Sequence, residues 1–168
     1  MYKVELFKKD NINLNKLLEG KIIKKIEYSE NIPLEDNSIR ITFLDNSDFL
    51  VYTFLRIINN GQIILCSADY YFDKNFVENN FNNSIENTLI QDALIKVNKL
   101  IKNKVINNVK MNCYGDLSIE IGENILIETF FDTMENDKDY YIYYGEDKTY
   151  LRFCKSENQL TVIEEVHE

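Results

Sequence analysis

The sequence predicts an α+β fold: two tandem copies of a helix followed by an antiparallel sheet of about four strands, fused into one domain with one long central helix. Three observations predict this fold. A pattern of apolar positions at 16–26 recurs at 99–109, strand-like segments follow each copy in the same order, and an apolar stripe at helical spacing runs through 85–101. The repeat period of about 80 residues is well above solenoid periods. We therefore expect a single domain over residues 1–168, with pseudo-repeats at about 11–70 and 84–145.

The two copies are expected to begin with helices of different length. A strand at 2–7 precedes a short helix at 13–19, which Gly20 closes because a residue without a Cβ suits the left-handed conformation after a helix end. Asn103 occupies the same position in the second copy. There the helix is expected to start at the N-cap Ser84 and to end at Lys102. Its apolar stripe should pack on a sheet through Leu89, Ala93, Leu94, Val97 and Ile101.

Each copy also contains a hairpin whose register follows from its apolar positions. A three-residue loop at 45–47 would place Phe43 opposite Phe49, and a three-residue loop at 122–124 would place Ile121 opposite Ile125. Alternating apolar and polar residues predict further strands at 22–28, 62–67, 105–112 and 140–144, and a C-terminal hairpin at 149–163. The polar, Asn-rich segment 73–83 is expected to be a mobile loop between the copies.

Charge and cysteine content narrow the class of partner. The chain has 28 acidic and 19 basic residues and a net charge of −9. Such a balance repels nucleic-acid phosphates and favours either a basic partner or simple solubility, so we expect no nucleic acid. Three cysteines do not form a disulfide framework, and no apolar run approaches the roughly 20 residues of a membrane span. We expect a cytoplasmic protein, monomeric or weakly dimeric, with no membrane contact.

Sequence motifs for catalysis are not found. The single histidine, His167, lies next to the C-terminal residue, where we expect the chain to fray. The chain contains no Cys-x-x-Cys, His-Glu-x-x-His or phosphate-binding glycine motif. The prediction is therefore a protein without catalytic residues, metal or cofactor.

An acidic, tyrosine-rich segment at 132–150 is the candidate partner-binding site. Alternation along a strand would put Tyr140 and Tyr144 on one face and Tyr141 and Tyr143 on the other, so one tyrosine set is expected to be exposed. Tyrosine offers a large contact area, and carboxylates around it would steer a basic partner. The alternative is a strand whose tyrosines cover the core, between solvated loops. The candidate residues are Asp132, Glu135, Asp137, Asp139, Tyr141, Tyr143, Glu146 and Asp147.

Three segments resemble a known family. They are Leu-x-Gly-Lys-Ile-Ile at 18–23, Ile-x-Ile-x-Phe at 39–43 and Gly-x-Ile-x-Leu-x-Ser-x-Asp-Tyr at 61–70. In a small acidic chain, this pattern resembles the β-rich immunity proteins of bacterial polymorphic toxin and contact-dependent growth inhibition systems. The resemblance covers residues 17–70 and, more weakly, 100–144. The doubled plan is also similar to the Whirly arrangement of two helix-braced sheets, although the acidic balance argues against the single-stranded DNA binding of that group.

The resemblance implies an immunity protein that binds and neutralises a cognate bacterial toxin domain, commonly a nuclease. The negative charge predicts that this toxin domain is basic, because complementary charge accelerates association. The alternative is a non-enzymatic domain that binds a small molecule, or serves as an adaptor, through the space between sheet and helix.

Overall fold

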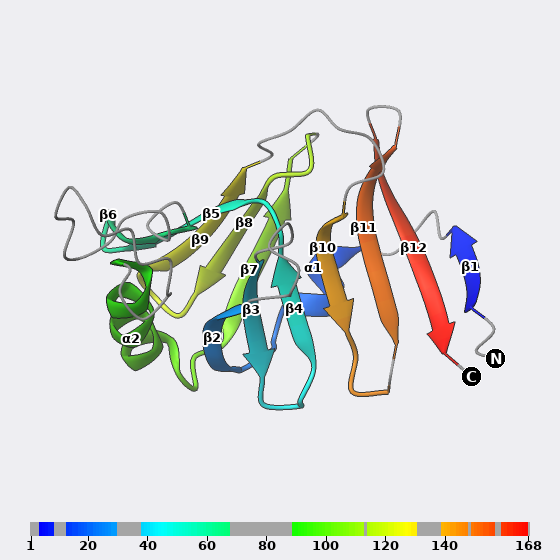
Figure 1. The fold of residues 1–168 in the computed structure, drawn as a ribbon. Helices are drawn as coiled ribbons and strands as arrows, with labels where there is room; N and C mark the ends of the chain where they lie inside the picture. Colours follow the sequence, from blue (N-terminus) through cyan, green and yellow to red (C-terminus); the bar gives the residue numbers. More distant parts are fainter. Residues whose placement is uncertain are drawn as a thin grey trace, which may run out of the picture.

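The computed structural model of the chain consists mainly of β-strands (Figure 1). It describes residues 4–8, 13–29, 38–67, 89–112, 114–130, 139–147, 149–156 and 159–167. Within these ranges the strands form two antiparallel sheets, and two helices accompany them. A single cluster of buried apolar side chains extends over both sheets and both helices. Neither helix in the described part of the chain is long and apolar enough to cross a membrane.

The larger sheet has seven strands in the order β1-β12-β11-β10-β4-β3-β2. Their bounds are β1 (Val4–Lys8), β2 (Ile23–Ser29), β3 (Ser38–Phe43), β4 (Asp48–Val51), β10 (Asp139–Tyr144), β11 (Tyr150–Ser156) and β12 (Gln159–His167). The smaller sheet has five strands in the order β6-β5-β9-β8-β7. Their bounds are β5 (Phe54–Asn59), β6 (Gln62–Cys66), β7 (Ile106–Met111), β8 (Leu117–Ile121) and β9 (Ile125–Phe130).

The two halves of the chain exchange strands. In the larger sheet, β2, β3 and β4 lie beside β10 and β11, whereas in the smaller sheet β7, β8 and β9 lie beside β5 and β6. Apart from β1 and β12, which extend one side of the larger sheet, each half places three strands in one sheet and two in the other, and the strand order is the same in both. The exchange begins after β4, where Tyr52 and Thr53 carry the chain into the second sheet. A tight hairpin is not favoured there, because neither residue is a Gly, Asn or Pro.

The predicted fold class is therefore wrong. The fold is mainly β, and neither half is a self-contained helix-plus-sheet unit. The second helix, α2 (Leu89–Ile101), has 13 residues and lies at one end of the assembly beside β2 and β6 rather than at its centre (Figure 1). The predicted stripe is correct at Leu94, Val97 and Ile101, which are buried, but Leu89 is 44% exposed and Ile90 is buried instead.

The two sheets meet at a short antiparallel contact between residues 20–23 and 103–106. Ile22 and Val105 face each other in an isolated bridge. Four backbone hydrogen bonds of 2.8–2.9 Å surround this bridge in two equivalent pairs. In the first pair, Gly20 N–H donates to Ile106 O and Asn103 N–H donates to Ile23 O. In the second pair, Ile23 N–H donates to Lys104 O and Ile106 N–H donates to Lys21 O. Gly20 and Asn103 have φ of +81° and +63°, which confirms the predicted left-handed positions.

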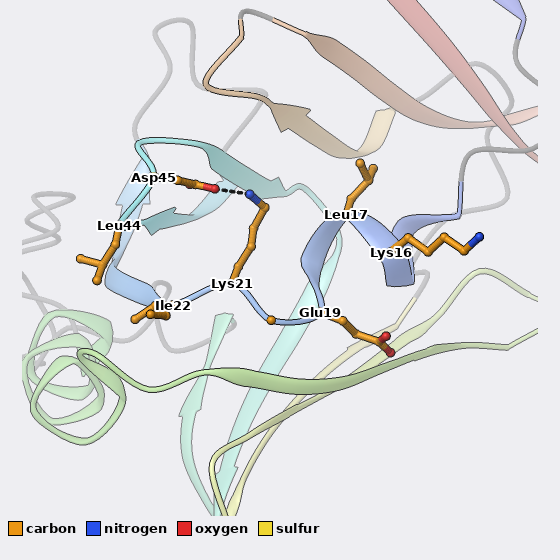
Figure 2. A pocket seen from close by; sticks show the side chains of 8 residues that line it. Lys16, Leu17, Glu19, Lys21, Ile22, Leu44 and Asp45 are labelled. Atoms are coloured by element: carbon orange, nitrogen blue, oxygen red, sulfur yellow. Dashed lines mark hydrogen bonds and ion pairs between the residues drawn. The ribbon is translucent and has the colours of Figure 1, made fainter.

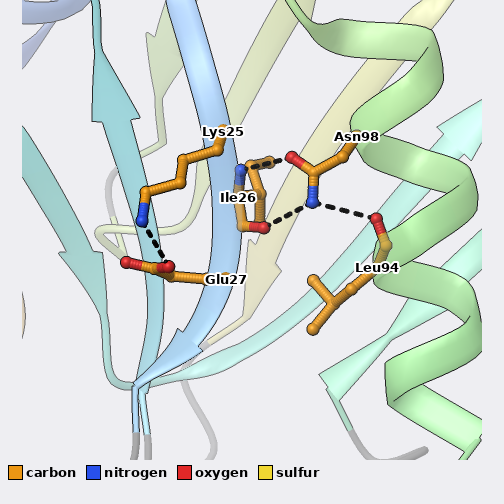
Figure 3. Close-up of polar contacts among 5 residues, drawn as sticks. All are labelled: Lys25, Ile26, Glu27, Leu94 and Asn98. Atoms are coloured by element: carbon orange, nitrogen blue, oxygen red, sulfur yellow. Dashed lines mark hydrogen bonds and ion pairs between the residues drawn. The ribbon is translucent and has the colours of Figure 1, made fainter.

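Each helix also covers the edge strand of the other half's sheet. The short helix α1 (Leu14–Leu18) packs near β7, and the Glu19 carboxylate after it accepts the Val109 N–H at 3.1 Å. On the other side, Asn98 of α2 accepts the Ile26 N–H at 2.7 Å and donates to the Ile26 carbonyl at 2.6 Å (Figure 3). These side chains satisfy backbone groups that an uncovered edge would offer to another strand.

The two hairpins differ in how well their registers follow the prediction. The second pairs Ile121 with Ile125 and is confirmed. In the first, Phe43 pairs with Ser47 and Ile41 with Phe49, so the predicted register is wrong by two residues. The cause is local: the Asp45 carboxylate accepts the Ser47 N–H at 3.0 Å and its hydroxyl at 2.6 Å, which ends the turn one residue earlier.

The C-terminal hairpin is longer than predicted. Its second strand, β12, continues to His167, which pairs with Val4 of β1. The expected fraying at this end is therefore wrong, because β1 supplies a backbone partner for the last described residues. The predicted loop at 73–83 lies outside the described residues.

Candidate functional site

Only part of the predicted partner-binding segment lies within the described residues. Asp132, Glu135 and Asp137 lie outside the described residues. Asp139 begins β10 and forms a two-pronged ion pair with Arg152 of the neighbouring β11, with Nε to Oδ1 and Nη2 to Oδ2 distances of 3.0 and 2.9 Å. This carboxylate is half-buried and held in the sheet, so it serves β10–β11 pairing.

The predicted tyrosines are buried. Tyr141 is fully covered, its ring stacks on Phe49 at 5.6 Å, and its hydroxyl contacts Thr129 Oγ1 at 2.6 Å and donates to Gly115 O at 3.0 Å. Burial raises the pKa of the Tyr141 hydroxyl well above its ordinary value. Tyr143 is 7% exposed. The expectation of one exposed tyrosine set is wrong, because β10 is an inner strand and residues 140–143 are buried on both of its faces, although Tyr144 at its end is exposed.

Glu146 and Asp147 are exposed, and the fold brings further carboxylates to them. They occupy the turn between β10 and β11. Because Tyr144 at the end of β10 pairs with Asp48 at the start of β4, this turn lies beside the β3–β4 turn, and both are at the lower end of the larger sheet in Figure 1. We call the resulting group, Asp45, Asp48, Glu146 and Asp147, the acidic tip. Lys148 of the same turn lies outside the described residues.

Asp45 is the most firmly held carboxylate of the acidic tip. It forms an ion pair with Lys21 and accepts the two bonds from Ser47. Burial alone would raise the pKa of Asp45, but the Lys21 and Ser47 bonds outweigh it and hold the pKa below its usual value. Lys21 is fixed in turn, with its ammonium over the Phe43 and Tyr143 rings at 5.5 and 5.4 Å.

The other carboxylates of the acidic tip differ in their exposure and hydrogen bonding. Asp147 accepts the Thr149 N–H at 3.0 Å, and bonds from Thr149 lower the pKa of this exposed carboxyl. One oxygen of Asp48, Oδ1, is buried and has no hydrogen-bond partner among the described residues. Apolar surface lies next to these charges, since Leu44 is 49% exposed and Tyr144 is 39% exposed. Tyr144 is also in ring contact with Tyr150 at 4.7 Å. The acidic tip therefore combines carboxylates with exposed aliphatic and aromatic side chains.

The corresponding end of the smaller sheet lacks this composition. There the β8–β9 turn at 122–124 adjoins the β5–β6 turn, with the Asn60 N–H bonded to Asn124 O at 3.0 Å. Glu123 is the single carboxylate in these two turns, whose other residues are Gly, Asn or Gln at 59–62, 122 and 124. The two ends have the same strand arrangement, so the fold itself does not require the acidic tip.

The described residues contain no group of three or more His, Cys, Asp or Glu side chains arranged to hold a metal ion. Sequence reasoning identified Glu146 and Asp147 but missed Asp45 and Asp48, because β4 and β10 are far apart in the sequence and only their pairing joins the two turns. Comparisons with protein-family models, with curated proteins and with solved structures gave no match.

Proposed function

We propose that this chain is a cytoplasmic immunity protein that binds a basic bacterial toxin domain through its acidic tip and thereby neutralises it. The observation that carries the proposal is the gathering of four carboxylates beside Leu44 and Tyr144, on two turns from different halves of the chain. The net charge of −9 and the resemblance to β-rich immunity proteins support the same reading.

The composition of the acidic tip suits a protein partner. Carboxylates on exposed turns accelerate the encounter with a basic surface, and their effect weakens as salt rises. Adjacent apolar and aromatic side chains supply the contact area that holds a complex together once formed. Asp45 and Asp147 are carboxylates at neutral pH, and their hydrogen bonds lower the pKa of each further. Inhibition follows if the bound chain covers the basic surface with which the toxin engages its own target.

The test uses the toxin domain encoded beside the gene for this chain, immobilised for kinetic measurement. The variant Glu146→Lys/Asp147→Lys reverses two exposed charges and should slow association by about tenfold or more at low salt, because steered and unsteered rates differ by orders of magnitude. The wild-type association rate should fall as salt rises, with a screening length of about 8 Å at physiological ionic strength.

The control is Glu123→Lys, which reverses the single carboxylate of the two turns at the corresponding end of the smaller sheet. It should leave the association rate close to that of the wild type. Co-expression should give the same order of effects, with growth protected by the wild type and the control but not by the double reversal. Failure of the wild type to bind any neighbouring gene product, or equal kinetics of both charge-reversal variants, would overturn the proposal.

A further inference from the structure

A pocket of about 460 Å³ adjoins the acidic tip. It lies between α1, the segment leading into β2, and the β3–β4 turn (Figure 2). Leu44 and Asp45 belong both to this pocket and to the surface of the acidic tip, so a partner that covers one must approach the other. The pocket is open to solvent rather than enclosed.

The pocket lining is mixed: three apolar side chains, Leu17, Ile22 and Leu44, alternate with four charged ones. Leu17 stands on one side in Figure 2, with Ile22 and Leu44 on the other. Ile22 is 36% exposed and Leu44 is 49% exposed, so both keep apolar surface that a partner could cover. The charged lining residues are Lys16, Glu19, Lys21 and Asp45, whose charges sum to zero. Lys21 is already bound to Asp45, and Glu19 accepts the Val109 N–H. Such a lining suits an uncharged apolar group better than a basic one.

The second half of the chain repeats two of the three apolar lining residues, with Leu100 for Leu17 and Val105 for Ile22, but it does not repeat Leu44. Gly122 stands in its turn where Leu44 stands in the first, and the aliphatic chain of Lys104 lies 3.3 Å from the place that a Cβ on Gly122 would take. The apolar wall is thus found at the same end of the molecule as the carboxylates of the acidic tip. The apolar wall departs from the repeat at Leu44, whereas Asp45 has an acidic counterpart in Glu123.

We infer that the pocket receives an apolar side chain, aliphatic or aromatic, from the same basic partner whose charged residues contact the acidic tip. This inference rests on the proposed function and adds a division of roles. The acidic tip sets how fast the complex forms, and the pocket sets how long it lasts, because buried anchors act mainly on dissociation.

Two variants test the pocket without altering the four carboxylates of the acidic tip, and Gly20→Asn does so away from the surface that the pocket and the tip share. Leu44→Ala removes an apolar wall from a half-exposed position, so stability should change little. Gly20→Asn fills part of the pocket: a Cβ there meets nothing within 4 Å, and Asn tolerates positive φ, as Asn103 does at the equivalent position. Each should raise the dissociation rate of the neighbouring toxin domain by about tenfold or more, with association unchanged. Ile63→Ala, at another exposed apolar residue on β6, should change neither rate.

Methyl NMR signals give a second readout that does not depend on mutation. Signals of Ile22 and Leu44 should shift when the toxin domain binds, whereas that of Ile63 should not. If toxin binding is wild-type in Leu44→Ala and Gly20→Asn and the two methyl signals stay unchanged, the inference fails and the proposed function stands. Retention of a small apolar molecule in the pocket of the toxin complex would likewise overturn it. If the wild type does not bind the toxin domain at all, both the inference and the proposed function are overturned. The charge-reversal experiment includes that measurement and so separates this outcome from failure of the inference alone.

Discussion

Replacing Asn98 with Ala should lower the free energy of unfolding by about 2 kcal/mol. The Asn98 side chain bonds both backbone groups of Ile26, at 2.7 and 2.6 Å, and also donates to Leu94 O at 3.0 Å (Figure 3). Each bond contributes about 0.5–1.5 kcal/mol net, and the part-buried N–H and C=O of Ile26 would lose their partner. The better helix propensity of Ala offsets roughly 0.5 kcal/mol of this loss.

Urea denaturation followed by circular dichroism measures the effect. Lys99→Ala is the matched control, because Lys99 is exposed on the same helix and its replacement tests helix propensity alone. The Asn98 variant should unfold at clearly lower urea, while the control should match the wild type. Equal midpoints for both variants would show that the Asn98 bonds to β2 contribute nothing to stability, and that water forms equally good hydrogen bonds with the Ile26 backbone.

Two further substitutions test the interactions of buried and turn residues. Because the pKa of Asp45 in the folded chain lies below the ordinary 3.8, its stabilising effect is present above about pH 3.8 and is lost as pH falls through the folded value. Asp45→Asn should therefore lower the free energy of unfolding by up to about 1 kcal/mol at pH 7, and by progressively less below pH 3.8. Urea unfolding of both proteins across pH measures this difference. A difference that does not change with pH would contradict the prediction. Tyr141→Phe removes the hydroxyl contacts with Thr129 and Gly115 and should cost about 1–2 kcal/mol in the same assay, whereas an unchanged midpoint would mean that these contacts carry no net energy.

Local sequence signals predicted local structure well. Alternation located strands that the structure contains, and Gly20 and Asn103 take the left-handed conformations expected after a helix. The register error in the first hairpin arose from a side chain, because the Asp45 bonds to Ser47 compete with the apolar pattern that the prediction used. A shift of two residues keeps every side chain on its original face, so the apolar pattern cannot detect it.

Sheet membership could not be predicted in the same way. The apolar faces of β5 and β10 would suit either sheet, and the choice depends on pairings between residues far apart in the sequence, such as Ile57 with Ile127 and Tyr141 with Val51. Locally, Tyr52 and Thr53 after β4 determine which sheet β5 joins, because they lead the chain out of the larger sheet. The acidic tip was only half identified for the same reason, because its two turns become neighbours solely through β4–β10 pairing.

The exchange of strands also determines when the acidic tip can exist. Its two turns come from different halves of the chain, and they lie together only when β10 has paired with β4 across the halves. A partner that binds the acidic tip therefore binds the fully assembled fold and not either half alone. By mass action, such a partner at a thousand times its Kd would stabilise the whole chain by about 4 kcal/mol. Topology determines that this stabilisation would extend to the whole chain, because the acidic tip and the junction between the halves share the β4–β10 strand pair.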